Sequence, residues 1–305
     1  MNIDFMSKRN YALIASVTLL VVSIVSLVFF GINRGLGFTG GVLVEIGFES
    51  PVDPLEVRQI LEAEGYENTV VQNLGSEREI VIRIPPGDDT DVDQSLVGDS
   101  IHSMLEEKYS SVDLRRSDYV GPAVGNELTE QGGLALLIAL ISVMIYIMFR
   151  FTGKFALGAV AALVHDVLVV VGIFSIFQWT FDLPELAALL AVIGYSLNDT
   201  IVVSDRIREN FRSIKRGTAI DVINRSLNQM LGRTLVTSLT TLLVLVALLI
   251  AGGEQLRGFA SALTIGVIVG TYSSIYIAAS MLVMLGIQGE DLAVPEKEGG
   301  DLVRR

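Results

Sequence analysis

Two oppositely charged side chains lie inside apolar segments, where a charge is energetically costly. Asp199 lies in an apolar run that begins at Leu183 and precedes Arg206 by seven residues, and Arg233 follows Arg225 by eight residues in another run. If Arg206 and Arg225 mark one edge of a membrane, a rise of 1.5 Å per residue places Asp199 about 10 Å and Arg233 about 12 Å inside that edge. A charge at the centre of a bilayer costs several kcal/mol, so such residues point to a function.

Polar residues accompany both charges at helical spacing. The two stripes are Tyr195, Asn198 and Asp199 in the first run, and Arg233, Thr237 and Thr240 or Thr241 in the second. Residues three and four apart share one face of a helix, so we expect both stripes to face the interior of a helical bundle. A further carboxylate, Asp166, follows His165 near the middle of a third apolar run. Gly158 and Ala162 precede it at intervals of four, and such small residues let a neighbouring backbone approach.

These residue types predict a proton or cation relay formed by Asp199, Arg233, Asn198 and Asp166, because a carboxylate can bind and release either ion. One alternative is that Asp199 and Arg233 form an ion pair that only holds two helices together. Another is an intramembrane aspartyl protease, in which Asp166 and Asp199 would share a proton. No catalytic glycine-aspartate motif surrounds either residue and a nearby arginine would keep Asp199 ionised, so we expect no enzymatic activity. The sequence leaves open whether the ion is H⁺ or Na⁺.

The composition predicts a membrane protein with an additional aqueous part. The 305 residues are 51% hydrophobic, with a mean hydropathy of +0.56, and 18% are charged. A span needs about 20 apolar residues. Six segments qualify: Tyr11 to Phe30, Leu134 to Phe149, Phe155 to Phe177, Leu183 to Val203, Leu231 to Ala251, and Phe259 to Leu285. The first apolar run is longer than that of a usual signal peptide and five more follow, so we expect it to be a retained helix.

The positive charges predict the orientation. Ten basic residues lie at one set of loops and ends: Lys8, Arg9, Arg150, Lys154, Arg206, Arg208, Arg212, Lys215, Arg216 and Arg225. The short loops on the other side hold only Arg257. Because basic residues stay on the cytoplasmic side, we expect a multi-pass cell-membrane protein with both termini in the cytoplasm and the segment between spans one and two outside.

That segment, Gly31 to Gln131, has the pattern of a folded α+β domain. The expected elements are a strand at Val42 to Phe48, a helix at Asp53 to Glu64, a strand near Thr69 to Asn73, a strand at Ile80 to Ile84, a helix at Asp93 to Tyr109 and a strand at Ser111 to Tyr119. The order β-α-β-β-α-β is that of a ferredoxin-like domain. We therefore predict a multi-pass α-helical membrane protein whose extracytoplasmic α+β domain lies between helices 1 and 2.

The same segment is strongly acidic, with 20 Asp and Glu against 7 Lys and Arg. We therefore expect no nucleic-acid partner. The acids are scattered, which favours a solvated surface over a site that attracts basic substrates. No metal-ligand spacing occurs among them, and the chain has no cysteine, so neither a metal nor a cofactor is predicted.

Four motifs resemble the SecF family of protein-export membrane proteins, within the SecD/SecF family of the RND superfamily. They are GFTGG at residues 37–41, VGPAVGNEL at 120–128, GYSLNDTIVVSDRIREN at 194–210 and NRSLNQMLGRTLVTSLTTLLVLVALL at 224–249. The resemblance covers nearly the whole chain. It implies a complex with a SecD-like six-span protein that works beside the SecYEG translocon and uses the ion gradient to draw secreted polypeptides outward. Asp199 and Arg233 match the family's functional carboxylate and arginine.

The resemblance also suggests how the parts cooperate. We expect the glycine motifs to couple the outer domain to spans one and two through Gly40, Gly41, Gly121, Pro122 and Gly125. The expected domains are residues 1–31 with helix 1, the outer domain at 32–131, helices 2 to 6 at 132–286 and a cytoplasmic tail at 287–305. An RND exporter of small solutes is the alternative function, but such exporters carry twelve spans and two large outer domains in one chain. Six spans and one small domain favour a half-transporter that needs a partner.

Overall fold

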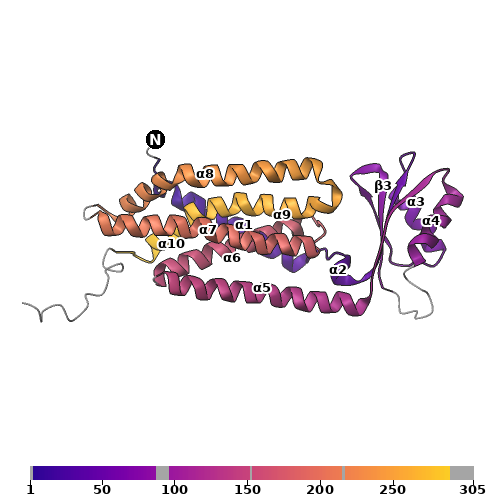
Figure 1. Ribbon diagram of the computed structural model, residues 1–305, viewed down its shortest axis with the longest axis horizontal. Helices are drawn as coiled ribbons and strands as arrows, with labels where there is room; N and C mark the ends of the chain where they lie inside the picture. The colour runs from indigo at the N-terminus through magenta and orange to yellow at the C-terminus, as the bar shows by residue number, and fades with distance from the viewer. Residues whose placement is uncertain (1–2, 87–95, 152, 215–216, 289–305) are drawn as a thin grey trace, which may run out of the picture.

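The computed structural model describes residues 3–86, 96–151, 153–214 and 217–288. The predicted tail after residue 288 and the first residues of the helix predicted from Asp93 lie outside the described residues. A long helical bundle carries an α+β domain at one end (Figure 1). We refer to the end of the bundle that faces this domain as the domain end, and to the opposite end as the far end.

Among the described residues, six long helices match the six predicted spans, which confirms the multi-pass helical architecture. They are α1 (Arg9–Phe29, preceded by the single turn η1, Met6–Lys8), α5 (Pro122–Arg150), α6 (Gly153–Ile176), α7 (Leu183–Ser213), α8 (Ala219–Ala251), and a last span built from α9 (Gly253–Ser273), the π-helical segment η3 (Ser274–Ala278) and α10 (Ala279–Met284). Helices α5, α7 and α8 are clearly longer than the apolar runs that predicted them, because polar residues at their ends remain helical.

Capping side chains explain where two of these helices begin. At α7, Asp182 accepts a hydrogen bond from the Leu183 N–H, while Glu185 accepts one from the Asp182 N–H at 2.8 Å. At α8, Thr218 and Asp221 form the corresponding pair. Both pairs satisfy backbone donors that the first turn of a helix leaves without partners, so each helix starts at a fixed residue.

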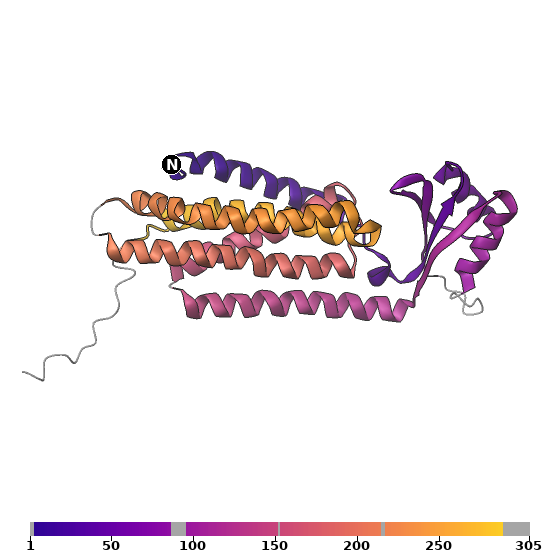
Figure 2. The same ribbon diagram turned by 45° about the horizontal axis from the view of Figure 1, so that its top comes forward.

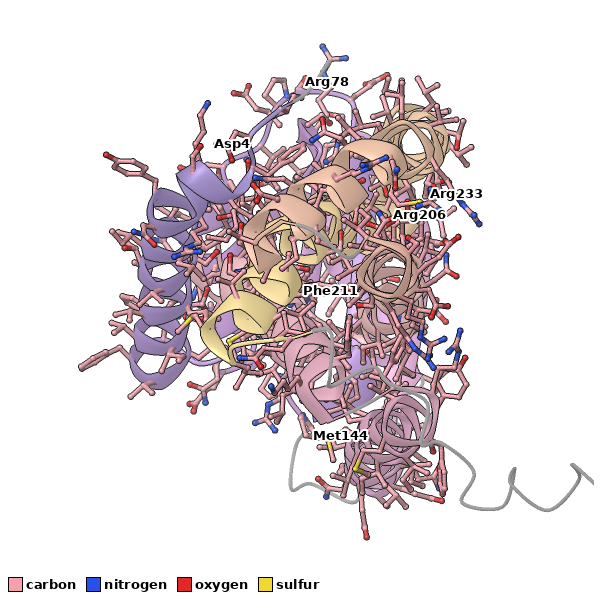
Figure 3. All side chains as sticks on the ribbon, turned by 90° about the vertical axis from the view of Figure 1, so that its left-hand side faces the viewer. Asp4, Arg78, Met144, Arg206, Phe211 and Arg233 are labelled. Atoms are coloured by element: carbon pink, nitrogen blue, oxygen red, sulfur yellow. The ribbon has the colours of Figure 1, made fainter. Side chains whose placement is uncertain are left out.

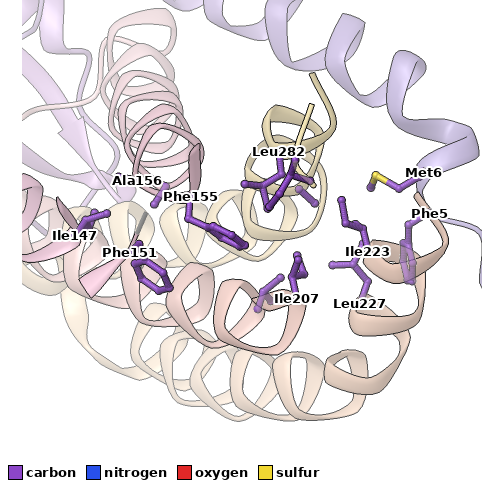
Figure 4. Close-up of a cluster of buried hydrophobic side chains, with 14 residues drawn as sticks. Phe5, Met6, Ile147, Phe151, Phe155, Ala156, Ile207, Ile223, Leu227 and Leu282 are labelled. Carbon is purple, nitrogen blue, oxygen red and sulfur yellow. The ribbon is translucent and has the colours of Figure 1, made fainter. Parts of the chain in front are cut away.

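Helices α6, α7 and α9 form the centre of the bundle, with α1 on one side and α5 on the other (Figures 2 and 3). Glycines of α9 allow the close packing: Gly266 lies under Val192 and Gly270 lies against Ser196. Small residues recur every four positions along this span, at Ala262, Gly266, Gly270, Ser274 and Ala278, a spacing that indicates close helix packing. Near the far end, a cluster of buried apolar side chains that includes Phe155, Ile207 and Leu282 joins several spans (Figure 4).

The α+β domain has the predicted ferredoxin-like topology. Its elements are β1 (Gly41–Phe48), α3 (Pro54–Ala63), β2 (Val70–Leu74), β3 (Ser76–Ile84), α4 (Val97–Lys108) and β4 (Val112–Val120). The four strands lie in the order β2-β3-β1-β4 and every neighbouring pair is antiparallel. Both helices cover the same face of the sheet (Figure 1).

The alternation of side chains along the strands gives the sheet two different faces. Val42, Val44 and Ile46 of β1 are buried in the core beneath α3 and α4. The intervening residues Leu43 and Glu45 point to the opposite face, because successive side chains of a strand alternate. That face lines a cleft of about 1170 Å³, whose other wall is the domain end of the bundle.

The two glycine motifs pack directly on each other where the domain joins the bundle. Gly40 and Gly41 have φ angles of +70° and +110°, which favour glycine strongly. A Cβ added at Gly125 would lie 2.8 Å from the Gly40 nitrogen, so the two backbones touch. In the second motif, Gly121 is the N-cap residue of α5 and Pro122 is its first residue. This span therefore starts where the domain ends, and not near Leu134 as the apolar run alone predicts.

Residues 3–6 are held against the start of α8. The backbone N–H and carbonyl of Ile3 both bond to the Asn228 side chain at 2.8 Å, and the Met6 N–H donates to the Asn224 side chain at 3.0 Å. Two asparagines of the NRSLNQ sequence therefore clip the N-terminal segment to the far end of the bundle.

Candidate functional site

Asp199 lies where α7, α8 and the last span meet. Its carboxylate is half-buried and accepts hydrogen bonds from the Thr234 hydroxyl of α8 at 3.1 Å and the Ser274 hydroxyl of η3 at 2.6 Å. Among the described residues its hydrogen-bond donors are these two neutral hydroxyls, and a carboxylate with such partners can still take up a proton or a small cation. The three spans around it are thereby joined through one ionisable group.

Asp166 on α6 is fully buried and more heavily bonded. One carboxylate oxygen accepts the hydroxyl of Ser273 at 2.7 Å and that of Ser196, and the other oxygen lies 2.9 Å from Nδ1 of His165. A fully buried polar group needs such partners, because an unsatisfied donor or acceptor costs about 1–3 kcal/mol. Asp166 thus connects α6 to α7 and to the last span.

The two carboxylates are linked by adjacent serines. Ser273 donates to Asp166 and Ser274 donates to Asp199, and the turn from α-helix to π-helix falls between them. Neighbouring helical residues point in different directions, so one serine reaches each carboxylate. Among the described residues no hydrogen bond joins Asp166 to Asp199, whereas a protease dyad would share a proton between its two carboxyl groups.

The prediction that the Arg233 stripe faces the bundle interior is wrong for this chain. Arg233, Thr237 and Thr240 are exposed, and Figure 3 shows Arg233 pointing away from the other spans. In the described part of the chain, no ion pair joins Arg233 to Asp199. Asn198 is also exposed, beside the half-buried Asp199. The two predicted stripes therefore meet at an open face of the bundle.

A different stripe of α8 faces inward. Thr234 and Ser238 are buried, and Ser238 receives a hydrogen bond from the Tyr195 hydroxyl at 3.3 Å and lies 2.6 Å from the Thr271 hydroxyl. Adjacent helical positions differ by about 100°, so a stripe that starts one residue later lies on another face. Hydroxyl groups bond well within a packed interface, while a guanidinium there would need charged partners.

The predictions from the sequence did not include several residues of the site. Ser274 belongs to the small-residue stripe and was interpreted as packing alone, although it also donates to Asp199. Glu185 is buried with 6% of its surface exposed, and the Asp182-x-x-Glu185 capping pattern is a signal that could have found it. Among the described residues, no group of three or more His, Cys, Asp or Glu could hold a metal ion.

Comparison with known families identifies the family of this chain. The family model described as "Protein export membrane protein SecD/SecF, C-terminal" matches residues 100–288, more than half of the chain. The chain belongs to the SecD/SecF family. A second model, the SecD/SecF GG Motif, matches residues 25–52 and includes GFTGG, so the family predicted from the motifs is confirmed.

SecF proteins match over nearly their full length. Protein translocase subunit SecF of Vibrio alginolyticus is 47% identical over 301 residues, covering 98% of this chain and 95% of that protein. The SecF of Pseudomonas aeruginosa is 47% identical over 296 residues, covering 96% of this chain and 95% of that protein.

A solved SecD/SecF structure shows the same fold. The structure of SecDF from Thermus thermophilus, described as a translocon-associated membrane protein, has a TM-score of 0.85 at 36% identity over 93% of this chain. SecDF in a super-membrane-facing form matches the same share with a TM-score of 0.69. This chain spans 39% of the SecDF polypeptide, so SecDF contains a further part that is larger than this chain.

Proposed function

We propose that this chain is the SecF-type subunit of a complex that assists the translocation of secreted polypeptides across the cell membrane. The complex pairs this chain with a SecD-like six-span protein beside the SecYEG translocon, and the ion gradient drives it through Asp199. Family membership supports the translocation role, and the geometry around Asp199 supports the relay. The half-buried carboxylate that joins three spans is the observation on which the relay depends.

The exposed Arg233 supports the need for a partner. It lies eight residues beyond Arg225, about 12 Å inside the membrane edge that Arg225 marks. A guanidinium at that depth is expensive in lipid, so we infer that a second polar surface covers the face formed by Arg233, Asn198 and Asp199. The additional part of SecDF, which is larger than this chain, supports a partner of at least this size.

A change in the charge of Asp199 would change how the three spans are held together. The ionised carboxylate accepts from both Thr234 and Ser274, whereas the protonated acid must itself donate one hydrogen bond. We include Asp166 in the relay because Ser273 and Ser274 are consecutive residues, so rearrangement at one carboxylate displaces a ligand of the other.

The available energy is sufficient for a conformational change. One charge that moves across 100 mV yields about 2.3 kcal/mol. This corresponds to a change of about 50-fold in an equilibrium constant, which is enough to bias a two-state domain. The contact between Gly40 and Gly125 gives the domain a close connection to α5, through which a helix movement could swing it.

The orientation can be tested by labelling, because the chain has no natural cysteine. We propose that the α+β domain lies outside and the far end of the bundle lies in the cytoplasm. A cysteine at the exposed Glu64 should react with a membrane-impermeant maleimide in intact cells, and one at the exposed Arg212 should react only after lysis. Labelling at Arg212 alone would invert the topology.

The decisive experiment is Asp199→Asn, which keeps the size of the side chain and removes its ability to ionise. We expect normal membrane levels and normal binding of the SecD-like partner, with loss of the stimulation of export by the ion gradient. Asp166→Asn should give an intermediate loss. The measurement is secretion of a model substrate with the gradient intact or collapsed, beside the amount of complex. Undiminished stimulation in a well-assembled Asp199→Asn complex would contradict the relay.

A further inference from the structure

The residue before α7 connects this span to the segment that carries the GFTGG motif. Both carboxylate oxygens of Asp182 accept from the Gly37 N–H, at 3.1 and 3.2 Å, and one of them also accepts from the Leu183 N–H at 2.9 Å. Residues 37 and 182 are far apart in sequence, so this is a tertiary contact in addition to a helix cap. A single carboxylate therefore holds the start of α7 and the short helix α2 (Leu36–Thr39) together.

The neighbouring backbone strengthens the connection. The Gly35 N–H donates to the Phe181 carbonyl at 2.9 Å, and the Phe181 N–H donates to the Asn33 carbonyl at 2.8 Å. The Phe38 and Phe181 rings stack with centroids 6.4 Å apart. The segment from Asn33 to Phe38 is thus joined to the loop between α6 and α7 by backbone bonds, a carboxylate and an aromatic contact.

Two glycines of this segment leave room for the Asp182 carboxylate. A Cβ added at Gly35 or at Gly37 would overlap the Asp182 side chain, although neither glycine has a positive φ angle. Glycine is therefore required at both positions because a larger side chain would clash with Asp182, and not because of the backbone conformation. The first glycine of the GFTGG motif, Gly37, serves the contact with Asp182, whereas Gly40 and Gly41 serve the turn into β1.

The α+β domain reaches the same loop through Arg83 of β3. Its guanidinium donates to the Thr180 hydroxyl at 2.5 Å. Burial lowers the pKa of Arg83, and the negative charge of Asp182 partly offsets that effect. The domain and the start of α7 therefore interact electrostatically as well as through the backbone of the GFTGG segment.

Asp182 is fixed to α7 with little freedom. Glu185 accepts from the Asp182 N–H at 2.8 Å and is itself buried, with Gly258 of α9 directly beside its carboxylate. From Asp182, the continuous helix α7 runs 17 residues to Asp199, about 26 Å at 1.5 Å per residue. A straight helix transmits a tilt or a shift at one position to its end.

We propose that Asp182 is a positioning residue that transmits movement of α7, the span that carries Asp199, to the GFTGG motif and so to the α+β domain. This inference rests on the proposed function, because it assumes that α7 responds to the charge of Asp199. If Asp182 only stabilised α7 as a helix cap, its substitution would lower the amount of folded protein. It would not change how far the domain moves when the charge of Asp199 is removed.

A double-mutant experiment on the full complex separates these roles. Spin labels at Glu64 in the domain and at Gln255 at the domain end of the bundle, both exposed, report the position of the domain. Asp199→Asn should shift the distance distribution in the otherwise unchanged protein. In an Asp182→Asn background and in a Gly37→Ala background, the same substitution should shift it by less than half as much. Gly153→Ala is the control, because nothing lies within 4 Å of a Cβ at that glycine.

Export provides the second measurement. We expect Asp182→Asn and Gly37→Ala to lower gradient-stimulated export by about tenfold, the usual effect of losing a charge-assisted hydrogen bond, without changing export in the collapsed gradient. If Asp199→Asn shifts the distance equally in all backgrounds, Asp182 transmits nothing and only this inference fails. If Asp199→Asn shifts no distance even in the unchanged protein, the coupling in the proposed function fails, and the role of Asp182 with it.

Discussion

The two intramembrane carboxylates of this chain have opposite surroundings. Asp166 is enclosed at the centre of the bundle and has partners on three sides, whereas Asp199 is half-buried and borders an open face with Asn198 and Arg233. An ion can reach a relay group only along a polar path. We therefore propose that the open carboxylate exchanges the ion with its surroundings, and that the enclosed carboxylate mainly holds the spans together.

The largest expected effect distinguishes the two sites by stability. Asp166→Leu would leave buried donors of His165 and Ser196 without their acceptor, at about 1–3 kcal/mol each. Asp199→Leu should cost less, because Ser274 keeps its bond to the Thr271 carbonyl. We expect the midpoint of thermal unfolding of the purified complex to fall clearly further for Asp166→Leu.

Val164→Leu is the control for this comparison, since Val164 lies on the same helix and is exposed. Equal losses of thermal stability for Asp166→Leu and Asp199→Leu would remove the distinction between an enclosed and an open site.

An intermediate effect is expected from the adjacent serines. Ser274→Ala removes the shorter hydrogen bond to Asp199 and should lower gradient-stimulated export by about tenfold. Ser273→Ala removes one of two hydroxyls on the same oxygen of Asp166, so export should stay within about threefold of the unchanged protein. The secretion assay with intact and collapsed gradients measures both. The reverse order would make Asp166 the site of ion exchange.

The smallest effect is expected at Thr234. Thr234→Val keeps the shape of the side chain and removes a hydrogen bond of 3.1 Å to Asp199, while Ser274 still donates to that carboxylate. We expect gradient-stimulated export to fall by about two- to threefold, as for a weak neutral donor. Thr237→Val on the exposed face is the matched control in the same assay. A loss as large as that of Ser274→Ala would show that the longer bond matters equally.

Much of the fold could be predicted because its signals are local. Apolar length alone predicts the six spans, and alternation along Val42 to Phe48 together with the cap at Asp53 predicts the elements of the domain. The inward face of α8 could not be predicted, because periodicity defines a stripe but not which stripe the neighbours cover. Arg233 was therefore assigned to the interior, where Thr234 lies instead.

The contacts that complete the site could not be predicted from the sequence for a different reason. Ser274 resembles any other small residue of the packing stripe until the position of Asp199 is known, and the sequence offers no sign of the π-helical turn that begins there. The bond between Asp182 and Gly37 joins segments that are distant along the chain. Such pairings follow from the three-dimensional arrangement of the helices and not from any one window of sequence.

The clip at the start of the chain sets an order of events during synthesis. Ile3 binds Asn228, a separation of 225 residues, so the bond cannot form until α8 has begun to emerge. At about 5–20 residues per second, the N-terminal segment waits roughly 10 to 45 s after its own synthesis. During that interval α1 can already be inserted while the residues before it remain undocked. Formation of these bonds is thus a late step in biogenesis, because it requires the start of the fifth span, α8.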